Sequence, residues 1–328
     1  MMEKKIVMVV DEMTDHKLDA DITRNDLEGN SADQTMRLRN SLEKVGQVVC
    51  YESIVEFTKH LHEHTHDIIF PMYYGPAGYN SKGIVPSLCE TYGINYVGAD
   101  AYAQLLCNDK TLSKQYASNF GVRSPKGYIL RPNADPNIVF SAIKTLDLPI
   151  VVKPNVGGGS TGIAANSIVH NHKDAIELAQ FLLNSLHVPI LIEEYIEGYE
   201  VELITVGSQK RIVFCEEVQL LMGNKTYFDH DLWSFETKSI DDSSIDFTIS
   251  HYISSEERNS LLDLFQSFDK LEMIRFDGRI RDGHFYLLEL SPDCYLGDDC
   301  AFYYAFQNKG FSHDEMFRFL IRNSLNPN

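Results

Sequence analysis

The chain has 328 residues, of which 44% are hydrophobic and 23% are charged, and its formal net charge is −18. The length exceeds one average domain, so two or three domains are expected, and the composition is that of a soluble globular protein. The negative charge argues against nucleic acid or an anionic membrane surface as a partner, so a phosphate site would depend on local cations and backbone N–H groups.

No apolar run approaches the roughly 18 residues that a membrane-spanning helix needs. The first residues, MMEKKIVMVV, lack the longer apolar region and the cleavage site of a signal peptide. The six cysteines are scattered and form no CxxC pair, so they are expected to be reduced thiols. These features predict a cytoplasmic protein with no membrane partner and no nucleic-acid partner.

The first 106 residues alternate short apolar strands with helices. The expected elements are a strand at 6–10, a polar loop at 11–30, a helix at 31–45, a strand at 48–51, a helix at 54–60, a strand at 68–70, a helix at 84–92 and a strand at 94–97. Ser31 is placed to cap the first helix. This order predicts a βαβ-type N-terminal domain, residues 1–106, with a parallel sheet. The loop that begins at Tyr74 follows a strand end, where open α/β sheets bind ligands.

Four alternating histidines, His60, His62, His64 and His66, stand before the third predicted strand. They lie at a junction between a predicted helix and a predicted strand, and their spacing does not gather all four on one face of a helix. We therefore interpret them as part of a solvated loop.

Residues 107–195 predict a second, smaller α/β domain with a mostly antiparallel sheet, and residues 196–328 predict a third domain. In the second domain the expected elements are a helix opened by 108–110 and ended by Gly121, a strand at 128–130, a helix at 137–146, a glycine-rich hairpin, a helix at 174–186 and a strand at 189–195. In the third they are strands at 200–206 and 211–214, a helix at 256–271, a hairpin at 274–290 and a helix at 311–324. The polar and aromatic segment 219–248 is typical of a lid or a disordered loop.

The glycine-rich hairpin at 148–163 reads LPIVVKPNVGGGSTGI. A short buried strand leads to Lys153, and the glycines follow. Glycines let the backbone approach a ligand and turn N–H groups toward an anion, and the lysine adds positive charge, which together suit a triphosphate. A dinucleotide fold would need a helix after the glycines, where a second strand is expected, and a Walker loop would need Gly-Lys-Ser/Thr. The remaining interpretation is a flap between two strands that covers phosphates, and the alternative is a hairpin that binds no ligand.

Two acidic residues stand in alternating strands that Asp282-Gly283 joins. A two-residue turn would place Asp277 and Glu289 on opposite faces, whereas a three-residue loop at 281–283 places both carboxylates on one face. A lone charge inside the apolar strand that holds Glu289 would be costly to bury. We therefore predict the three-residue loop and a carboxylate pair that binds Mg²⁺ together with ATP phosphates.

With these residues in hand, the chain resembles the ATP-grasp carboxylate–amine ligases, and most of all the D-alanine–D-alanine ligases, from about residue 31 to its end. The resemblance implies an ATP-grasp fold of three α/β subdomains, in which a parallel N-terminal sheet precedes central and C-terminal antiparallel sheets that clamp ATP. It also implies small-molecule carboxylate and amine substrates, and a homodimer.

The family's motifs have counterparts in this chain. Asp109-Lys110 resembles its Asp-Lys pair, VVKP with GGGSTG its lysine and phosphate loop, and Arg275-Phe276-Asp277 its Arg-x-Asp motif. The implied ATP contacts are Lys110, Lys153, Gly158, Gly159, Ser160, the adenine-reading hinge of Glu193, Glu194, Tyr195 and Ile196, and the ribose-binding Glu200. The implied catalytic residues are Arg275, which supports the acyl phosphate, Lys153 and Ser160. Asp277, Glu289 and Ser291 would bind two Mg²⁺ ions, with Mn²⁺ as an alternative.

The departures from the family gather on the substrate side. Its Glu-x-Asn is Glu289-Leu290-Ser291 here, so a hydroxyl replaces a metal-binding amide. Its Pro-Gly segment and a serine, which handle the second amino acid, become residues 292–297 and Cys300. Trp233 and Ser234 stand where the family has a Lys-Tyr pair. The implied substrate contacts are Tyr74, Asp293, Gly297 and Cys300, and we interpret Cys294 and Cys300 as shaping the pocket rather than attacking the substrate.

We therefore hypothesise an ATP-dependent ligase that forms an amide through an acylphosphate, with an amino acid or a dipeptide as substrate. Two alternatives are open. Ser291 and the missing loop lysine favour a catalytically silent ATP-binding protein, and the altered pocket also suits an ATP-grasp ligase for a non-amino-acid metabolite of a biosynthetic pathway. The presence of Arg275, Asp277 and Glu289 together favours catalysis.

Overall fold

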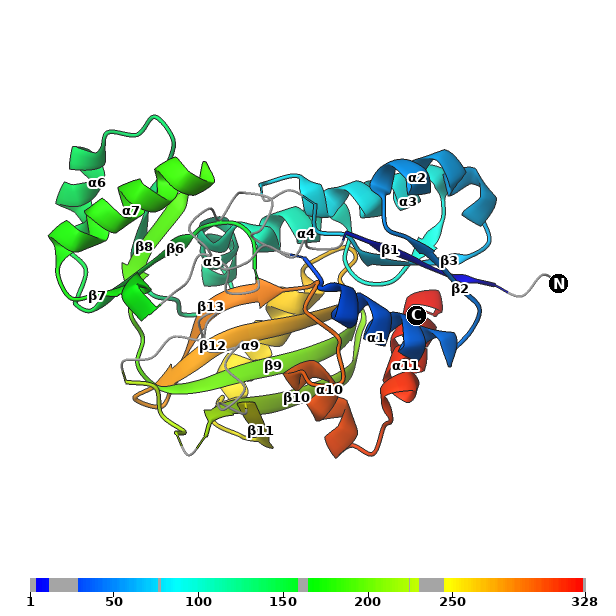
Figure 1. Cartoon of the computed structure of the whole chain (residues 1–328). Helices are drawn as coiled ribbons and strands as arrows, with labels where there is room; N and C mark the ends of the chain where they lie inside the picture. Colours follow the sequence, from blue (N-terminus) through cyan, green and yellow to red (C-terminus); the bar gives the residue numbers. More distant parts are fainter. Residues whose placement is uncertain are drawn as a thin grey trace.

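Three β-sheets frame the computed structural model of the chain, which describes residues 4–11, 29–75, 78–158, 165–223, 225–229 and 245–326 (Figure 1). The first sheet is parallel and the other two are antiparallel, as the sequence predicts. Within the described ranges, no helix has both the length and the apolar character that crossing a membrane requires. The domain boundaries after residues 106 and 195 stay predictions.

The N-terminal sheet has the strand order β2-β1-β3-β4. Its strands are β1 (Ile6–Val10), β2 (Val48–Tyr51), β3 (Ile68–Met72) and β4 (Asn95–Tyr96), and its helices are α1 (Ala32–Glu43), α2 (Ile54–His60) and α3 (Ile84–Tyr92), with 3-10 turns at Leu61–His64 and Ser81–Gly83. Every residue of β1 is buried because its alternate side chains enter hydrophobic clusters on the two faces of the sheet. Ser31 caps α1 in a capping box with Gln34, which confirms the predicted cap.

The histidines before β3 are not all solvated, and this corrects the interpretation from the sequence. His64 is buried; its Nε2 lies 2.8 Å from the Tyr51 hydroxyl and its Nδ1 lies 2.9 Å from the Asp67 carboxylate. Asp67 also accepts a hydrogen bond from the Lys5 backbone N–H at 2.9 Å. His64 therefore belongs to a satisfied buried polar network that joins the 3-10 turn Leu61–His64 to the sheet.

The central sheet has the strand order β5-β8-β6-β7. Its strands are β5 (Gly127–Leu130), β6 (Ile150–Pro154), β7 (Ile168–Val169) and β8 (Ile190–Glu194), and α6 (Pro136–Ile143) and α7 (His172–Leu186) pack with it in one hydrophobic cluster. Val152 of β6 and its cross-strand partner Ile192 enter that cluster. Because side chains alternate along a strand, Lys153 and Glu193 lie on the opposite face of the sheet. The sheet thereby turns charged residues away from its own helices.

The C-terminal sheet has the order β11-β10-β9-β12-β13. Its strands are β9 (Tyr199–Ser208), β10 (Arg211–Met222), β11 (Ile245–Ile249), β12 (Met273–Arg281) and β13 (His284–Ser291). On one face, α4 (Ala101–Asn108), α5 (Lys110–Ser118) and α9 (Ser255–Gln266) share a hydrophobic cluster with the sheet; on the other, α10 (Ala301–Asn308) and α11 (His313–Leu325) share a cluster that includes β1 and β3. One core therefore joins the N-terminal and C-terminal sheets (Figure 1).

Among the helices and strands of the described ranges, α4, α10 and β11 have no counterpart in the sequence predictions. α10, with the sequence AFYYAFQN, packs between the C-terminal sheet and α11 and buries Ala301, Phe302, Ala305 and Phe306. β10 also continues to Met222, into the segment that was expected to be a loop. Residues 230–244 of that segment lie outside the described ranges.

The turn of the β12–β13 hairpin differs from the predicted one. Arg281 pairs with His284, so the turn has two residues, Asp282 and Gly283, with φ of 53° and 76°. These left-handed values are typical of a type I′ turn, and the predicted three-residue loop is wrong. Farther along, the register shifts at a bulge, where Gly278 pairs with Leu287 but Asp277 pairs with Glu289.

The bulge restores the arrangement that the turn alone would have lost. Leu288 is the extra residue, and by shifting the pairing it brings Asp277 directly opposite Glu289. The predicted common face of the two carboxylates is therefore confirmed, although the loop that was expected to produce it is not present. Gly278 makes room at this point, because a β-carbon there would lie 2.2 Å from a ring carbon of Phe285 and 2.7 Å from the Tyr286 carbonyl oxygen.

We predict that Gly278→Ala destabilises the protein by about 2 kcal/mol or more, because the added methyl group overlaps the Phe285 ring and the backbone beside the bulge. Urea unfolding followed by circular dichroism measures the change. Gly46→Ala is the matched control, since a β-carbon there meets no atom closer than 3.5 Å. Equal stability of the two variants would show that the bulge does not depend on the glycine.

Candidate active site

Residues of the central sheet, α5 and the β12–β13 hairpin come together where α5 lies between the two antiparallel sheets (Figure 1). The Asp109 side chain caps α5 by accepting a hydrogen bond from the Leu112 N–H at 2.9 Å, and Lys110 is the first helical residue. The Lys110 ammonium lies 3.0 Å from Glu289 and also donates to the carbonyl of Gly157. Lys110 thus joins a carboxylate of the hairpin to the start of the glycine-rich segment.

Two asparagines that are not among the predicted site residues fix this junction. Asn155 donates to the Asp109 carboxylate at 2.8 Å and accepts from the Thr111 hydroxyl at 2.6 Å. Asn108 accepts from the Gly157 N–H at 3.0 Å. Both asparagines are buried, so the end of β6 and the start of α5 are held as one unit by satisfied hydrogen bonds.

The carboxylate pair lies on adjacent strands with an arginine beside it. Asp277 and Glu289 are cross-strand partners, and the Ser291 hydroxyl donates to Asp277 at 3.2 Å. Arg275 makes a two-pronged contact with Asp277, at 2.6 Å from Nε and 2.8 Å from Nη2, and its Nε lies 3.4 Å from Glu202. The residues of the predicted Arg-x-Asp and Glu-x-Ser motifs are therefore brought together.

The two carboxyl groups of the pair have different electrostatic environments. Burial raises the pKa of Asp277, the contact with Arg275 opposes this effect, and the neighbouring Glu289 adds to it. Burial also acts to raise the pKa of Glu289, but the ammonium groups of Lys110 and Lys153 outweigh burial and hold that pKa below its ordinary value. Glu289 therefore keeps its negative charge more firmly than Asp277 does.

The donor set fits Mg²⁺ bound together with a nucleotide. Mg²⁺ in phosphoryl-transfer sites takes one or two carboxylates, and substrate phosphates and water complete its six oxygens. Asp277 and Glu289 supply the carboxylates, and the Ser291 hydroxyl adds an oxygen beside Asp277. In the described part of the chain, no group of three or more His, Cys, Asp or Glu side chains is arranged to hold a metal ion without such help.

A second charge cluster lies on the inner face of the central sheet. The Glu193 carboxylate bridges two ammonium groups, at 2.7 Å from Lys153 and 2.5 Å from Lys114, and all three residues are buried. Burial lowers the pKa of Lys114 to about 8, against the attraction of Glu193. Burial acts to raise the pKa of Glu193, but the two lysines together lower it. The Glu193 side chain thus holds the phosphate-loop lysine, and its predicted contact with adenine stays a prediction.

The hinge after β8 is held by an arginine that no motif predicts. Arg279 donates to the carbonyl of Ile196 at 2.9 Å and to Glu200 at 3.0 Å and 2.7 Å. Its guanidinium also lies 4.9 Å from the ring centre of Tyr195. Glu194 accepts from the Asp147 N–H at 3.2 Å. The hinge residues and Glu200 are therefore close together, as a nucleoside contact requires, and their ligand roles stay predictions.

The residues predicted to contact the substrate fall into two groups: Tyr74 with Asp293, and Gly297 with Cys300. Tyr74 donates from its hydroxyl to the carbonyl of Asp293 at 3.2 Å, so the N-terminal loop touches the segment after β13. Gly297 accepts a hydrogen bond from the Cys300 thiol at 3.1 Å, and the Cys300 sulfur accepts from the Tyr303 N–H at 3.4 Å at the start of α10. The second group therefore shapes the backbone that leads into α10.

The two cysteines near this segment are poor nucleophiles. Burial raises the pKa of the Cys300 thiol to about 12 and also raises that of Cys294 well above its ordinary value. The thiolate is the reactive form, so both side chains are neutral near pH 7. This agrees with their interpretation as pocket-shaping residues.

Several predicted residues lie outside the described ranges: Gly159 and Ser160 of the glycine loop, and Trp233 and Ser234 of the long segment. Gly158, the last described residue before the gap, directly follows the Gly157 carbonyl that Lys110 contacts.

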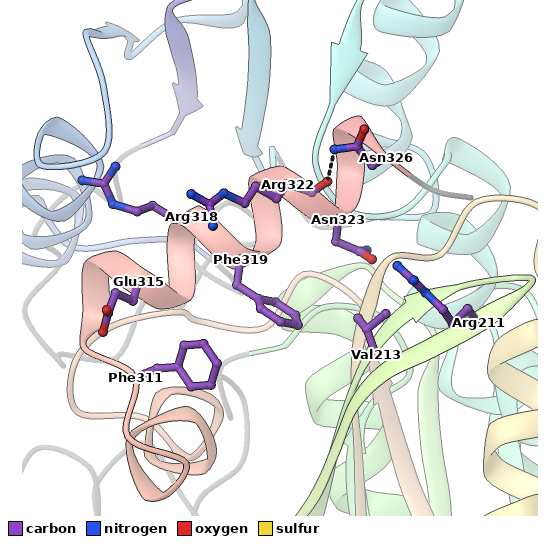
Figure 2. Close-up of a pocket in the computed structure, with 9 residues that line it drawn as sticks. All are labelled: Arg211, Val213, Phe311, Glu315, Arg318, Phe319, Arg322, Asn323 and Asn326. Atoms are coloured by element: carbon purple, nitrogen blue, oxygen red, sulfur yellow. Dashed lines mark hydrogen bonds between the residues drawn. The ribbon is translucent and has the colours of Figure 1, made fainter.

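A hollow of about 490 Å³ lies elsewhere, between α11 and the start of β10 (Figure 2). Phe311, Phe319 and Val213 form its apolar wall. Its arginines do not converge: Figure 2 shows Arg318 extending away from Arg211. The Arg318 guanidinium also contacts the Lys44 carbonyl. None of the predicted site residues lines this hollow.

The chain has a parallel N-terminal sheet followed by two antiparallel sheets, and paired lysines and carboxylates lie where these two sheets meet. This arrangement defines an ATP-grasp fold. The D-alanine–D-alanine ligase from Bacillus anthracis, solved in complex with ATP, superposes with a TM-score of 0.73 over 98% of both chains at 16% identity. The VanG D-Ala:D-Ser ligase from Enterococcus faecalis has a TM-score of 0.68, with 98% of this chain and 99% of that chain covered at 15% identity. These likenesses show the fold.

The sequence comparisons show the family. Residues 128–322 match the family model described as D-ala D-ala ligase C-terminus. The D-alanine–D-alanine ligase A of Bacillus cereus is 26% identical over 264 residues, which cover 80% of this chain and 83% of the relative. The chain belongs to the D-alanine–D-alanine ligase family, a family of ATP-dependent, ADP-forming carboxylate–amine ligases.

We predict that Glu193→Gln lowers the free energy of unfolding by about 3 kcal/mol or more, because it leaves two ammonium groups buried without a carboxylate. Urea denaturation measures the loss. Glu194→Gln is the control at the adjacent position, where a half-buried carboxylate accepts one backbone hydrogen bond, and its effect should stay below about 1 kcal/mol. Similar effects in both variants would contradict the assignment of Glu193 to the lysine pair.

We also predict that Cys294 and Cys300 resist alkylation at pH 8, because a buried thiol with a raised pKa holds almost no thiolate there. Iodoacetamide treatment of the native protein, followed by peptide mass mapping, should label the half-buried Cys50 and Cys215 first. Rapid labelling of Cys300 at pH 8 would show an accessible, activated thiol and overturn this account.

Proposed function

We propose that this chain catalyses the ATP-dependent joining of a carboxylate to an amine, with release of ADP and phosphate. One observation carries the proposal: the Lys110 ammonium lies 3.0 Å from Glu289 and also contacts the first glycine of the phosphate-loop segment. A lysine shared between a glycine turn and a carboxylate pair is suited to a metal-bound triphosphate. Membership of an ATP-dependent ligase family supports the same reaction.

On the phosphate side, Lys110 and Lys153 would neutralise the triphosphate. Both ammonium groups are buried and are paired with carboxylates, Glu289 and Glu193. Each ammonium has three donors, so it is able to bind a phosphate oxygen and keep its protein partner. Because phosphoryl transfer leaves little covalent work to the protein, this positioning and charge neutralisation would be the main contribution to catalysis.

On the transfer side, the donor carboxylate attacks the γ-phosphorus, the bond to the β-phosphate oxygen breaks, and an acyl phosphate and ADP form. The amine then attacks the acyl carbon, phosphate leaves, and the amide remains after loss of a proton. Arg275, fixed by Asp277, would face the negative charge that develops on the transferred group. Asp277, Glu289 and Ser291 would hold Mg²⁺, which withdraws charge from the phosphate oxygens when bound.

For the substrates, we infer amino acids or dipeptides. The relative from Bacillus cereus is named a D-alanine–D-alanine ligase, and the family likeness covers most of both chains. The identity of 26% leaves room for a different pair of amino acids. The setting that we propose is the cytoplasm, which supplies ATP and keeps thiols reduced; all six cysteines are free.

We predict ADP release that depends on amino acids when the protein, Mg²⁺ and ATP are incubated with a panel of single and paired amino acids. Mass spectrometry of the mixture should detect a condensed product with a mass lower than the sum of the two substrates by one water.

The control is the double variant Asp277→Asn/Glu289→Gln, which keeps the size of both side chains and should abolish product formation. Tight ATP binding by the wild type without ADP release on any pair would exclude the proposed reaction with amino acids.

A further inference from the structure

A partly buried ion pair between the 3-10 turn before α3 and the segment after β13 has no role in the nucleotide chemistry above. The Lys82 ammonium lies 2.8 Å from Oδ2 of Asp293, and the two side chains are 9% and 15% exposed. Lys82 belongs to the 3-10 turn before α3, and Asp293 follows the end of β13. The same two segments are tied a second time, because Tyr74 donates to the Asp293 carbonyl and its ring lies 5.5 Å from the Lys82 ammonium.

This ion pair lies beside the reacting groups. Asp293 stands two residues after Ser291, whose hydroxyl contacts the metal-site residue Asp277. Lys82 is also one of the cations whose charge reaches the Glu289 carboxylate, after Lys110 and Lys153. The Lys82 ammonium is therefore a third positive charge near the carboxylate pair, and it comes from the 3-10 turn before α3, whereas Lys110 and Lys153 come from α5 and β6.

The pairing of Asp293 is incomplete for a carboxylate with one buried oxygen, Oδ2. Its Oδ2 contacts the ammonium at 2.8 Å but makes no well-directed hydrogen bond with any residue in the described ranges. A buried ion pair recovers its desolvation cost only when further hydrogen bonds satisfy both groups. An incompletely satisfied pair next to the residues of the predicted metal site is better explained as part of a ligand subsite than as a contribution to stability.

The chemistry of the reaction decides which substrate Lys82 serves. The donor carboxylate becomes an acyl phosphate, so it must lie beside the γ-phosphate and the carboxylate pair. A carboxylate bound by Lys82 would be one that does not react, and the amine substrate is the partner that keeps its carboxylate. A lysine ammonium has three donors, so Lys82 is able to hold this carboxylate while it remains paired with Asp293.

We propose that Lys82 binds the free carboxylate of the amine substrate and restricts this substrate to amino acids and peptides, with Asp293 positioning the ammonium. This inference depends on the proposed ligase function. The substrate class is therefore an amine with a free carboxylate; simple amines and amino-acid amides are excluded.

The test separates the two half-reactions. Hydroxylamine attacks the acyl phosphate in place of the amine substrate, so that a hydroxamate forms and phosphate leaves; this measures activation of the donor alone. In Lys82→Met, hydroxamate formation should be unchanged, whereas the KM for the amino-acid acceptor should rise about 10- to 100-fold, the range expected for a lost charged hydrogen bond. Lys82→Arg, which keeps the charge, should recover most of the affinity. The wild type should reject the corresponding amino-acid amide as an acceptor. Lys82→Met should accept the amino acid and its amide with similar KM values.

Each outcome is decisive. An unchanged acceptor KM in Lys82→Met would overturn the inference, and so would loss of hydroxamate formation in a variant with the wild-type Tm, since Lys82 would then serve the donor. If the wild type forms no hydroxamate with any donor, the proposed function fails before an amine is added, and the inference fails with it.

Discussion

The unpaired residue Leu288 shifts the β12–β13 pairing by one position, and the rest of the site depends on this shift. Without it, the two-residue turn would place Asp277 and Glu289 on opposite faces of the hairpin. With it, both carboxylates lie on one face of the hairpin, where Lys110 contacts Glu289 at 3.0 Å. A local bulge is thus the reason why the C-terminal sheet presents two carboxylates together beside the lysine at the start of α5.

The charges gathered here are balanced inside the protein. Lys110 pairs with Glu289, Arg275 with Asp277, and Glu193 with two lysines. Although the chain has a net charge of −18, it gathers these lysines and Arg275 where phosphate would bind. Because the lysines are buried and held by partners, little side-chain entropy remains to be lost when a ligand arrives. This preorganisation is what a ligase that works by positioning requires.

The sequence predicts the fold well where the signal is local. Ser31 caps α1 with the expected geometry. The β12–β13 turn is an exception: Asp282-Gly283 forms the two-residue turn that this dipeptide usually signals, and the three-residue loop predicted in its place is wrong. The bulge is not predictable in this way, because it depends on a contact that exists only in the folded hairpin: the ring of Phe285 fills the space that a side chain at Gly278 would need. His64 is similar: its burial depends on Tyr51 and Asp67, which only the folded sheet brings together.

The same limit applies to the site. Motifs identify Lys110, Lys153, Arg275, Asp277 and Glu289, but they do not reveal that Glu193 turns toward lysines or that Lys82 meets Asp293. A crystal structure with a non-hydrolysable ATP analogue and Mn²⁺ tests the central claim most directly. The account predicts anomalous density between Asp277 and Glu289, with phosphates against Lys110 and Lys153. Density for the metal or the phosphates at any other place would contradict it.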